Sequence, residues 1–247
     1  MTNLPMLGHV ALITGGVRRI GRACALALAE EGADVVLHAR NSREEAEAVA
    51  REVEALGRRA LVLLCDITDE AAVEAMFAEI DRAFGRLDIL VNNAALRGEA
   101  HFTEMSYAEW KQITGVILDG AFLASRAALR RMAPRGYGRI VSMGGVSAHL
   151  GAKERAHVGA AKAGLIGFTR ALAVEFAAQG VTVNCVIPGK IGGKRAATAG
   201  KGIAGAPIVG REGVPEDVAE LVRMLCRPAS SFITGQSMHV NGGMYLP

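Results

Sequence analysis

The sequence is poor in aromatic residues and has no long apolar run. Only 4% of its 247 residues are Phe, Trp or Tyr. No apolar stretch reaches the about 18 residues that a membrane-spanning helix needs, and no charged-then-apolar leader opens the chain. We therefore expect a protein that neither spans a membrane nor is exported.

Neither sign of charge dominates, and the cysteines lack the spacing of a metal site. The formal net charge is +3, with basic and acidic residues interspersed, which argues against nucleic acid as a partner. The four cysteines lie far apart, without a CxxC or Cys/His pattern: Cys24, Cys65, Cys185 and Cys226. We expect no bound metal, and buried free thiols in a reducing cytoplasm.

What the chain does contain is an alternation of short β-branched runs with longer helical patterns. Strands are predicted at residues 9–14, 34–39, 60–65, 89–92, 139–143, 182–187 and 237–240, and helices at 20–30, 43–56, 70–84, 115–132, 158–178 and 215–226. Such alternation is typical of βαβ units and a parallel sheet. Nearly continuous apolar strands indicate helices on both faces. The prediction is an α/β fold, a single Rossmann-type doubly wound parallel sheet flanked by helices, in one domain over residues 1–247.

One long stretch, residues 189–213, is rich in glycine, alanine and basic residues and has weak periodicity. Loops of this length are either functional covers or poorly ordered segments. We interpret it as a flexible, substrate-covering loop, with a plain disordered loop as the alternative.

The first predicted strand runs into a helix through a glycine-containing turn, residues 14–21, which reads Thr-Gly-Gly-Val-Arg-Arg-Ile-Gly. In such a turn backbone N–H groups approach a diphosphate, and the helix N-terminus favours its negative charge. Its place after the first strand of a βαβ unit strengthens this interpretation.

The end of the second strand predicts which dinucleotide binds. An acidic residue there would bond the adenosine ribose, whereas a basic one accommodates a 2′-phosphate. Here Ala39 is followed by Arg40, and Arg18, Arg40 and Ser42 together suit a phosphate clamp. The sequence predicts NADP(H) in preference to NAD(H), with arginines that cap a surface loop as the alternative.

In the order of its motifs the chain resembles the short-chain dehydrogenase/reductase family. The family's TGxxxGxG turn matches Thr14, Gly15 and Gly21, with Arg19 at the middle glycine. Residues 65–67, 92–95 and 188–189 match later cofactor segments of the family, and residues 234–236 and 241–243 match its closing pattern. The resemblance implies cofactor contacts from Thr14, Gly15, Arg18, Arg19, Ile20, Gly21, Arg40, Asn41, Ser42, Asp66, Ile67, Asn92, Ala94, Lys162, Pro188, Gly189 and Ile191.

The resemblance also implies a reaction centre of asparagine, serine, tyrosine and lysine, of which only the lysine, Lys162, is present. Ile117, Gly145 and Val158 stand at the other three positions. In the family this lysine also holds the nicotinamide ribose. Because histidine titrates near neutrality, His149 and His157 are the candidate substitute acids, with a solvated loop as the alternative.

Three functions are compatible with this pattern. The favoured one is an atypical NADP(H)-dependent oxidoreductase that transfers hydride to or from a small activated carbonyl or imine substrate. The second is a catalytically silent NADP(H)-binding or partner subunit, because the family commonly forms dimers or tetramers; we expect a homo-oligomer, such as a homotetramer, or pairing with an active relative. The third is a non-redox lyase, hydratase or cyclase that reuses the pocket around His149, Glu154 and His157.

Overall fold

Seven parallel strands form the centre of the molecule. They are seen in a computed structural model that describes residues 4–192 and 205–247, and their order there is β3-β2-β1-β4-β5-β6-β7. The strands are β1 (Val10–Thr14), β2 (Asp34–Ala39), β3 (Ala60–Leu64), β4 (Ile89–Asn92), β5 (Gly138–Met143), β6 (Val181–Pro188) and β7 (Ser237–Val240). The order reverses between β1 and β4, as in a doubly wound Rossmann-type sheet, so the predicted fold is confirmed.

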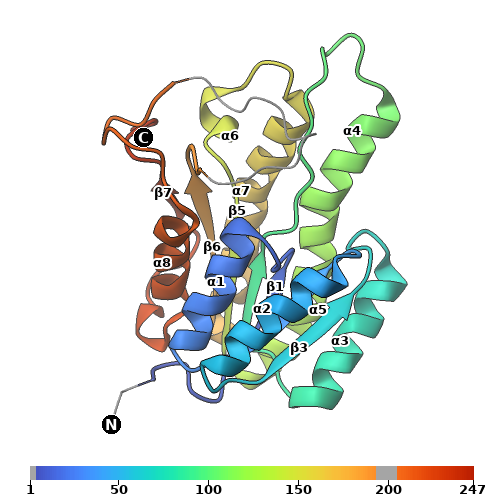
Figure 1. Ribbon diagram of the computed structural model, residues 1–247, viewed down its shortest axis with the longest axis vertical. Helices are drawn as coiled ribbons and strands as arrows, with labels where there is room; N and C mark the ends of the chain where they lie inside the picture. The colour runs from blue at the N-terminus through green and yellow to red at the C-terminus, as the bar shows by residue number, and fades with distance from the viewer. Residues whose placement is uncertain (1–3, 193–204) are drawn as a thin grey trace.

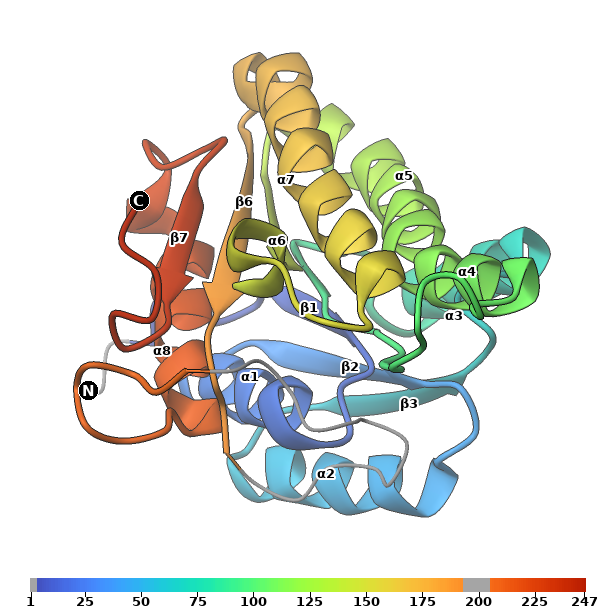
Figure 2. The same ribbon diagram turned by 90° about the horizontal axis from the view of Figure 1, so that it is seen from above.

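Helices cover both faces of this sheet (Figures 1 and 2). One face carries α1 (Arg19–Glu30), α2 (Arg43–Ala55) and α8 (Pro215–Cys226), and the other carries α3 (Glu70–Phe84), α5 (Gly120–Met132) and α7 (Ala156–Phe176). Within the two described segments, no helix combines the length and apolarity that crossing a membrane requires.

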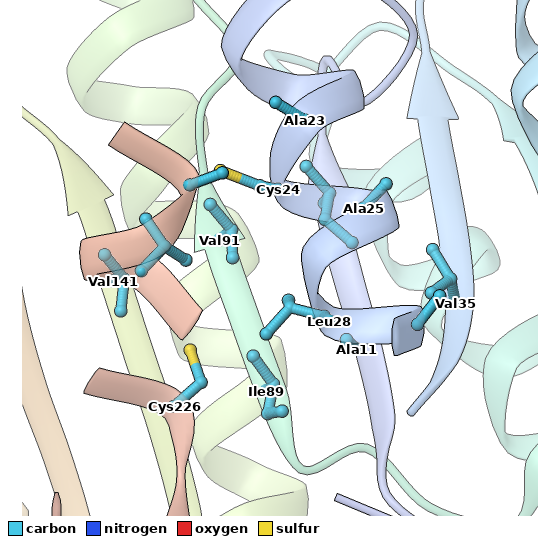
Figure 3. Packing of buried hydrophobic residues seen from close by; sticks show 14 of the residues in the cluster. Ala11, Ala23, Cys24, Ala25, Leu28, Val35, Ile89, Val91, Val141 and Cys226 are labelled. Atoms are coloured by element: carbon cyan, nitrogen blue, oxygen red, sulfur yellow. The ribbon is translucent and has the colours of Figure 1, made fainter. Parts of the chain in front are cut away.

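The core beneath α1 shows why small residues dominate this face (Figure 3). Ala25 and Leu28 of α1 are fully buried in the cluster that also holds Ile89 and Val91 of β4. Alanine lets the helix approach the sheet closely, while leucine and the β-branched strand residues fill the remaining space. Cys24 belongs to the same core, and burial raises the pKa of its thiol, so this free cysteine is unreactive.

The prediction missed two helices, α4 (Tyr107–Thr114) and the short α6 (Ser147–Leu150). Helix α4 buries only Ile113, so its apolar periodicity is weak. Its start did carry a signal, a capping box in which Ser106 and Glu109 bond each other's backbone. A five-residue π-helical turn (Gly115–Asp119) joins α4 to α5, and the predicted helix over 115–132 is therefore the second half of a longer one.

The predicted loop over residues 189–213 is described only at its two ends. Residues 193–204 lie outside the described residues. At the ends, Ile191 forms a parallel bridge with Gly213, and the N–H of Gly192 donates to the Gly213 carbonyl at 2.8 Å. The base of the loop is thereby held together beside the end of β6.

The carboxyl ends of β1 and β4 are joined by two side chains. The Thr14 hydroxyl donates to the Val91 carbonyl at 3.3 Å and accepts from the N–H groups of Asn93 and Ala94, both at 3.0 Å. The Asn93 amide donates to the carbonyls of Thr14 and Gly15 at 3.0 and 2.8 Å. These bonds fix the start of the glycine-containing turn.

A buried histidine at the end of β2 holds the same turn from the other side. His38 Nδ1 accepts from the Gly15 N–H at 3.3 Å, and His38 Nε2 lies 3.1 Å from the Cys65 carbonyl, to which it donates. These partners require the neutral imidazole, and burial lowers the pKa of His38 below its ordinary 6.5.

We predict that the free energy of unfolding falls as pH is lowered below about 6.5, the pKa at which an exposed histidine of the unfolded chain takes up its proton. A histidine with a lowered folded-state pKa stabilises fully above that pH, and each contributes at most about 1.4 kcal/mol per pH unit below it. His9, His157 and His239 also have lowered pKa values and act with the same sign. Urea unfolding between about pH 5.5 and 8 should show a shallower slope for His38→Gln than for wild type. The exposed control His101→Gln should keep the wild-type slope; an unchanged slope in His38→Gln would contradict the assignment.

Candidate functional site

A pocket lies at the carboxyl edge of the sheet, beside the point where the strand order reverses. It is formed by the loops after β1, β4, β5 and β6 and by the start of α7. Open α/β sheets bind their ligands at this place. The lining residues are Arg19, Ile20, Asn93, Ala95, Leu96, Arg97, Met143, Gly144, Gly145, Val146, Ser147, Arg155, Val158, Lys162, Pro188, Gly189, Lys190 and Ile191.

Part of the predicted cofactor set meets in this pocket: Arg19, Ile20, Lys162, Pro188, Gly189 and Ile191. Two other members have side chains that are buried in the fold. The Thr14 hydroxyl joins β1 to β4, and the Asn92 amide donates to the hydroxyls of Ser125 and Ser142 at 2.9 and 3.4 Å. Both hold the framework of the site rather than face its opening.

The N-terminus of α1 opens beside the pocket without a cap. Its N-cap residue, Arg18, makes no capping bond, and the first turn contains no acidic side chain. Arg19 adopts a left-handed φ of 49° and donates from Nη2 to the carbonyls of Ile191 and Gly192 at 2.9 and 3.0 Å. The first N–H groups of a helix lack intrahelical partners, so this end can bind an anion.

The turn around that helix end leaves no room for a side chain at Gly21. A Cβ there would lie 2.2 Å from the Gly15 carbonyl oxygen and 2.7 Å from the Asn93 amide nitrogen. Both contacts are far inside van der Waals range. The last glycine of the motif, Gly21, is therefore required by the close approach of α1 to the turn.

The ends of β2 and β3 carry the predicted phosphate clamp. Arg40 pairs with Asp66 at 3.0 Å, and Arg18 pairs with Glu45 of α2. Asp66 also accepts from the N–H and hydroxyl of Thr68, and these bonds, more than Arg40, lower the pKa of its carboxyl. Each arginine of the clamp thus already has an acidic partner that an incoming phosphate must displace or share.

The other residues predicted to contact the cofactor lie after the ends of β2, β3 and β4. Asn41 is exposed and Ser42 half-buried at the start of α2, where Ser42 makes no capping bond. Ile67 is buried, and a Cβ at Gly120 would lie only 2.8 Å from its side chain. The Ala94 N–H is bonded to Thr14, so it is not available to a ligand.

Lys162 is a buried cation of the pocket. It projects from α7 and its ammonium donates to the Met143 carbonyl at the end of β5. The pKa of Lys162 is lowered to about 8, mainly by burial and secondly by the charge of Arg97. A lysine with such a pKa exchanges protons near neutral pH, unlike an exposed one.

The space beside Lys162 is open where Gly145 lacks a side chain. A Cβ at Gly145 would lie 3.6 Å from the Ser147 hydroxyl oxygen and 3.9 Å from Lys162 Cγ, both ordinary contacts. Val158, one helical turn before Lys162, lines the same pocket and offers no polar atom. Lys162 and Ser147 therefore flank a gap large enough for a ligand atom.

Ser147 was not among the residues that the sequence singled out. It lies two residues after Gly145, at the start of α6, and faces the pocket. The serine in the run Gly-Gly-Val-Ser after a predicted strand was the available signal. Asn93 was also missed, although its neighbour Asn92 was chosen; its amide bonds show that it is the one at the turn.

The two histidines proposed as acids are placed elsewhere. His149 packs against His239 and Tyr245, with ring centroids 4.8 Å away in each case. His157 is buried, and its Nε2 lies 3.6 Å from the place that a Cβ on Gly98 would occupy. Neither imidazole lines the pocket formed by the described residues, so the structure does not bring them together with Lys162.

A second, apolar groove lies on the outer surface of α5 and α7. Its aromatic members are Phe122, Phe168 and Phe176; Leu129 and Leu172 also line it, and Arg126, Arg130 and Glu175 are its charged members. Phe122 is about half exposed, at 45%. An apolar surface of this kind is typical of a protein–protein contact.

Comparisons with known proteins agree with this architecture. A family profile described as enoyl-(acyl carrier protein) reductase matches residues 15–245. The chain is 39% identical to the 3-oxoacyl-[acyl-carrier-protein] reductase FabG of Escherichia coli (strain K12) over 243 residues, which are 97% of this chain and 98% of that relative. It is 38% identical to FabG of Aquifex aeolicus (strain VF5) over 248 residues, 98% of this chain and 99% of the relative. It is 36% identical to the 3-oxoacyl-[acyl-carrier-protein] reductase of Synechocystis sp. (strain ATCC 27184 / PCC 6803 / Kazusa) over 247 residues, 98% of each. With the parallel sheet and its pocket, these matches show that the chain belongs to the short-chain dehydrogenase/reductase family of oxidoreductases.

Proposed function

We propose that this protein is an NADP(H)-dependent oxidoreductase that transfers hydride to or from a small activated carbonyl or imine carbon without a tyrosine acid. One observation carries the proposal. Buried Lys162 faces the switch-point pocket beside an open gap, while Val158 and Gly145 occupy the positions where the family resemblance implies tyrosine and serine. The names of the relatives, which are reductases of a 3-oxoacyl group, support a carbonyl substrate.

The residues of the site fit a phosphorylated dinucleotide. The uncapped N-terminus of α1 and the Arg19 guanidinium suit the diphosphate, and Arg40, with Arg18 and Ser42, suits a 2′-phosphate. Lys162 would hold the nicotinamide ribose. When bound, NADP(H) supplies or accepts the hydride.

Lys162 and Ser147 are the groups that handle the substrate oxygen. The Lys162 ammonium has three N–H donors and uses one on the Met143 carbonyl. In the reducing direction it gives one proton to the carbonyl oxygen, and its pKa of about 8 suits an acid that works near neutrality. The Ser147 hydroxyl donates a hydrogen bond to the same oxygen from the other side of the gap. An iminium substrate needs no proton, so the same site serves it without an acid.

The geometry gives less support to the other functions. The non-redox hypothesis depended on His149, Glu154 and His157, none of which lines the pocket in the described part of the chain. The hypothesis of a silent subunit shares the dinucleotide site with the proposal made here, and the apolar groove on α5 and α7 supports self-association in either case. We also propose that the protein is cytoplasmic, because its four cysteines are free thiols, and that it forms a homo-oligomer through this apolar groove.

Replacing Arg40 with alanine should weaken NADPH binding about tenfold or more and leave NADH binding unchanged. A hydrogen bond to a charged group contributes about 1.5–3 kcal/mol, and about 1.4 kcal/mol is tenfold in affinity. Calorimetric titration with both nucleotides measures the effect. Arg43→Ala is the matched control, because Arg43 is equally exposed and pairs only with Glu47 within α2 among the described ion pairs. An equal loss for both nucleotides would refute the 2′-phosphate assignment.

The kcat/KM for carbonyl reduction should fall as pH rises through about 8, because Lys162 loses the proton that it donates. Lys162→Met should remove this dependence and lower the rate about 10²–10⁴-fold, the usual contribution of a positioned acid. NADPH oxidation across ketones, quinones and imines between pH 6 and about 10 provides the measurement.

The double variant Val158→Tyr/Gly145→Ser is the second arm of that experiment. A Cβ at Gly145 meets only ordinary contacts, so the serine is accommodated. We expect the double variant to reduce ketones faster than wild type, and its rate to depend less on the protonation of Lys162. If both the wild type and the double variant bind NADPH but neither oxidises it with any acceptor, the silent subunit remains as the function.

Phe122→Glu should convert the oligomer to a monomer in native mass spectrometry. A carboxylate placed in this apolar contact loses its hydration, and Arg126, which already lies over the Phe122 ring, offsets only part of that cost. Phe232→Glu is the control, because Phe232 is fully exposed and lies outside the groove. A monomeric wild type would contradict self-association outright.

A further inference from the structure

The surroundings of Lys162 disfavour its charged form. The residue is only 9% exposed, and it lines the pocket together with Val158 of the same helix. Within residues 4–192 and 205–247, its ammonium donates to the Met143 carbonyl alone, and no carboxylate belongs to the pocket lining. A buried ammonium is ordinarily paired with a carboxylate, because a single neutral carbonyl replaces little of its lost hydration. Lys162 therefore gives up its proton more readily than an exposed lysine.

The size of this effect makes the neutral amine available near neutral pH. Burial is the largest cause that lowers the pKa of Lys162 to about 8; the charge of Arg97 lowers it too, and the Cys185 thiol of β6 raises it. At pH 7 roughly one Lys162 side chain in ten is then neutral, against roughly one in 2,500 for a lysine with the ordinary pKa of about 10.4. The other cations of the lining are Arg19, Arg155 and Lys190.

The space beside this amine can hold a carbonyl group. A Cβ at Gly145 would lie 3.9 Å from Lys162 Cγ and 3.6 Å from Ser147 Oγ, so the volume between the two side chains is open. Val158 bounds it with an apolar surface. The Ser147 hydroxyl can donate a hydrogen bond to a carbonyl oxygen placed there. A lysine that is desolvated in an apolar pocket is the kind that forms imines with carbonyl compounds.

We propose that Lys162 is also a covalent nucleophile, whose Nζ forms an imine with a small aldehyde or ketone in the nucleotide-free protein. This goes beyond the proposed function, in which the same side chain donates a proton, and it needs no NADP(H).

The reaction uses only the amine, the carbonyl compound and water. The neutral Nζ adds to the carbonyl carbon, so that a C–N bond forms and the π electrons of the C=O bond move to oxygen. One proton passes from nitrogen to that oxygen, which gives a carbinolamine. The nitrogen lone pair then expels the hydroxyl group, which takes up a solvent proton and leaves as water. The product is an iminium ion, and hydrolysis returns the amine.

Reductive trapping tests the imine in the wild-type protein. The nucleotide-free protein is incubated at pH 7 with propanal and sodium cyanoborohydride, which reduces iminium ions, and the alkylated lysines are quantified by peptide mass spectrometry. Lys111 and Lys153 are exposed and serve as references within the same chain. Lys162 should be alkylated about tenfold faster than either, because its neutral fraction is larger by roughly two orders of magnitude while a less basic amine is a weaker nucleophile.

The pH dependence distinguishes this mechanism from simple accessibility. The ratio of alkylation at Lys162 to that at Lys153 should stay constant below about pH 8 and fall above it. Lys162 is by then fully neutral, whereas an ordinary exposed lysine still gains neutral amine up to about pH 10. Each sample carries its own reference, so the effect of pH on the reductant cancels.

A matched pair of variants tests the role of the missing carboxylate. Val158→Glu places a negative charge one helical turn before Lys162, which favours the ammonium, whereas Val158→Gln has the same shape without the charge. Trapping at pH 7 should be about tenfold or more faster in Val158→Gln than in Val158→Glu, since a neighbouring opposite charge shifts a pKa by about 1–3 units.

Alkylation of wild-type Lys162 no faster than that of Lys153 would overturn the imine, and so would equal trapping in Val158→Glu and Val158→Gln. The wild-type comparison depends on no variant, so poor folding of a variant leaves it decisive. Saturating NADP⁺ should slow alkylation at Lys162 and not at Lys111, because the nicotinamide ribose would use the same amine. Trapping at Lys162 that NADP⁺ does not slow would support the imine and contradict the proposed role of Lys162 in holding the nucleotide.

Discussion

The site depends on the junction between β1 and β4. There the Thr14 hydroxyl and the Asn93 amide join the two strand ends, and His38 fixes the N–H of Gly15 from β2. The resulting turn brings the N-terminus of α1 to the edge of the sheet. The helix approaches the turn so closely there that position 21 has no room for a side chain. Without these bonds the uncapped helix end would not face the pocket. A few buried polar contacts therefore decide where an anionic group can bind.

The electrostatics of the pocket follow from burial. Lys162 is buried among apolar side chains and backbone, so its charged form is disfavoured, and Arg97 adds repulsion. Neighbouring cations with carboxylate partners, Arg155 and Lys190, do not provide a negative charge inside the lining. Protonation of Lys162 near neutral pH is therefore set by its burial in the pocket and by the neighbouring positive charge.

At the two positions where the family resemblance predicts a tyrosine and a serine, this chain has Val158 and Gly145. Gly145 leaves space beside Lys162, and Val158 gives that space an apolar wall. Ser147 of α6 contributes a hydroxyl to the same pocket. A hydroxyl two residues along the chain reaches the same gap because α6 turns it inward. In the proposed reaction the acid is therefore a lysine whose pKa is lowered by its surroundings rather than a phenol.

The sequence by itself determined the sheet, the helices that pack on it and the glycine turn, because apolar periodicity and glycine placement are local properties of the chain. Strands β2, β4 and β7 and helices α3 and α8 have the predicted bounds. Only the tertiary structure decided which polar residues share the pocket. His149 and Ser147 are two residues apart, yet Ser147 lines the pocket with Lys162, whereas His149 packs against residues of β7 and the C-terminal segment. Arg40 likewise meets Asp66 only because β2 and β3 are neighbours. Which way a side chain points is set by elements distant in sequence that pack around it, and no local pattern encodes that.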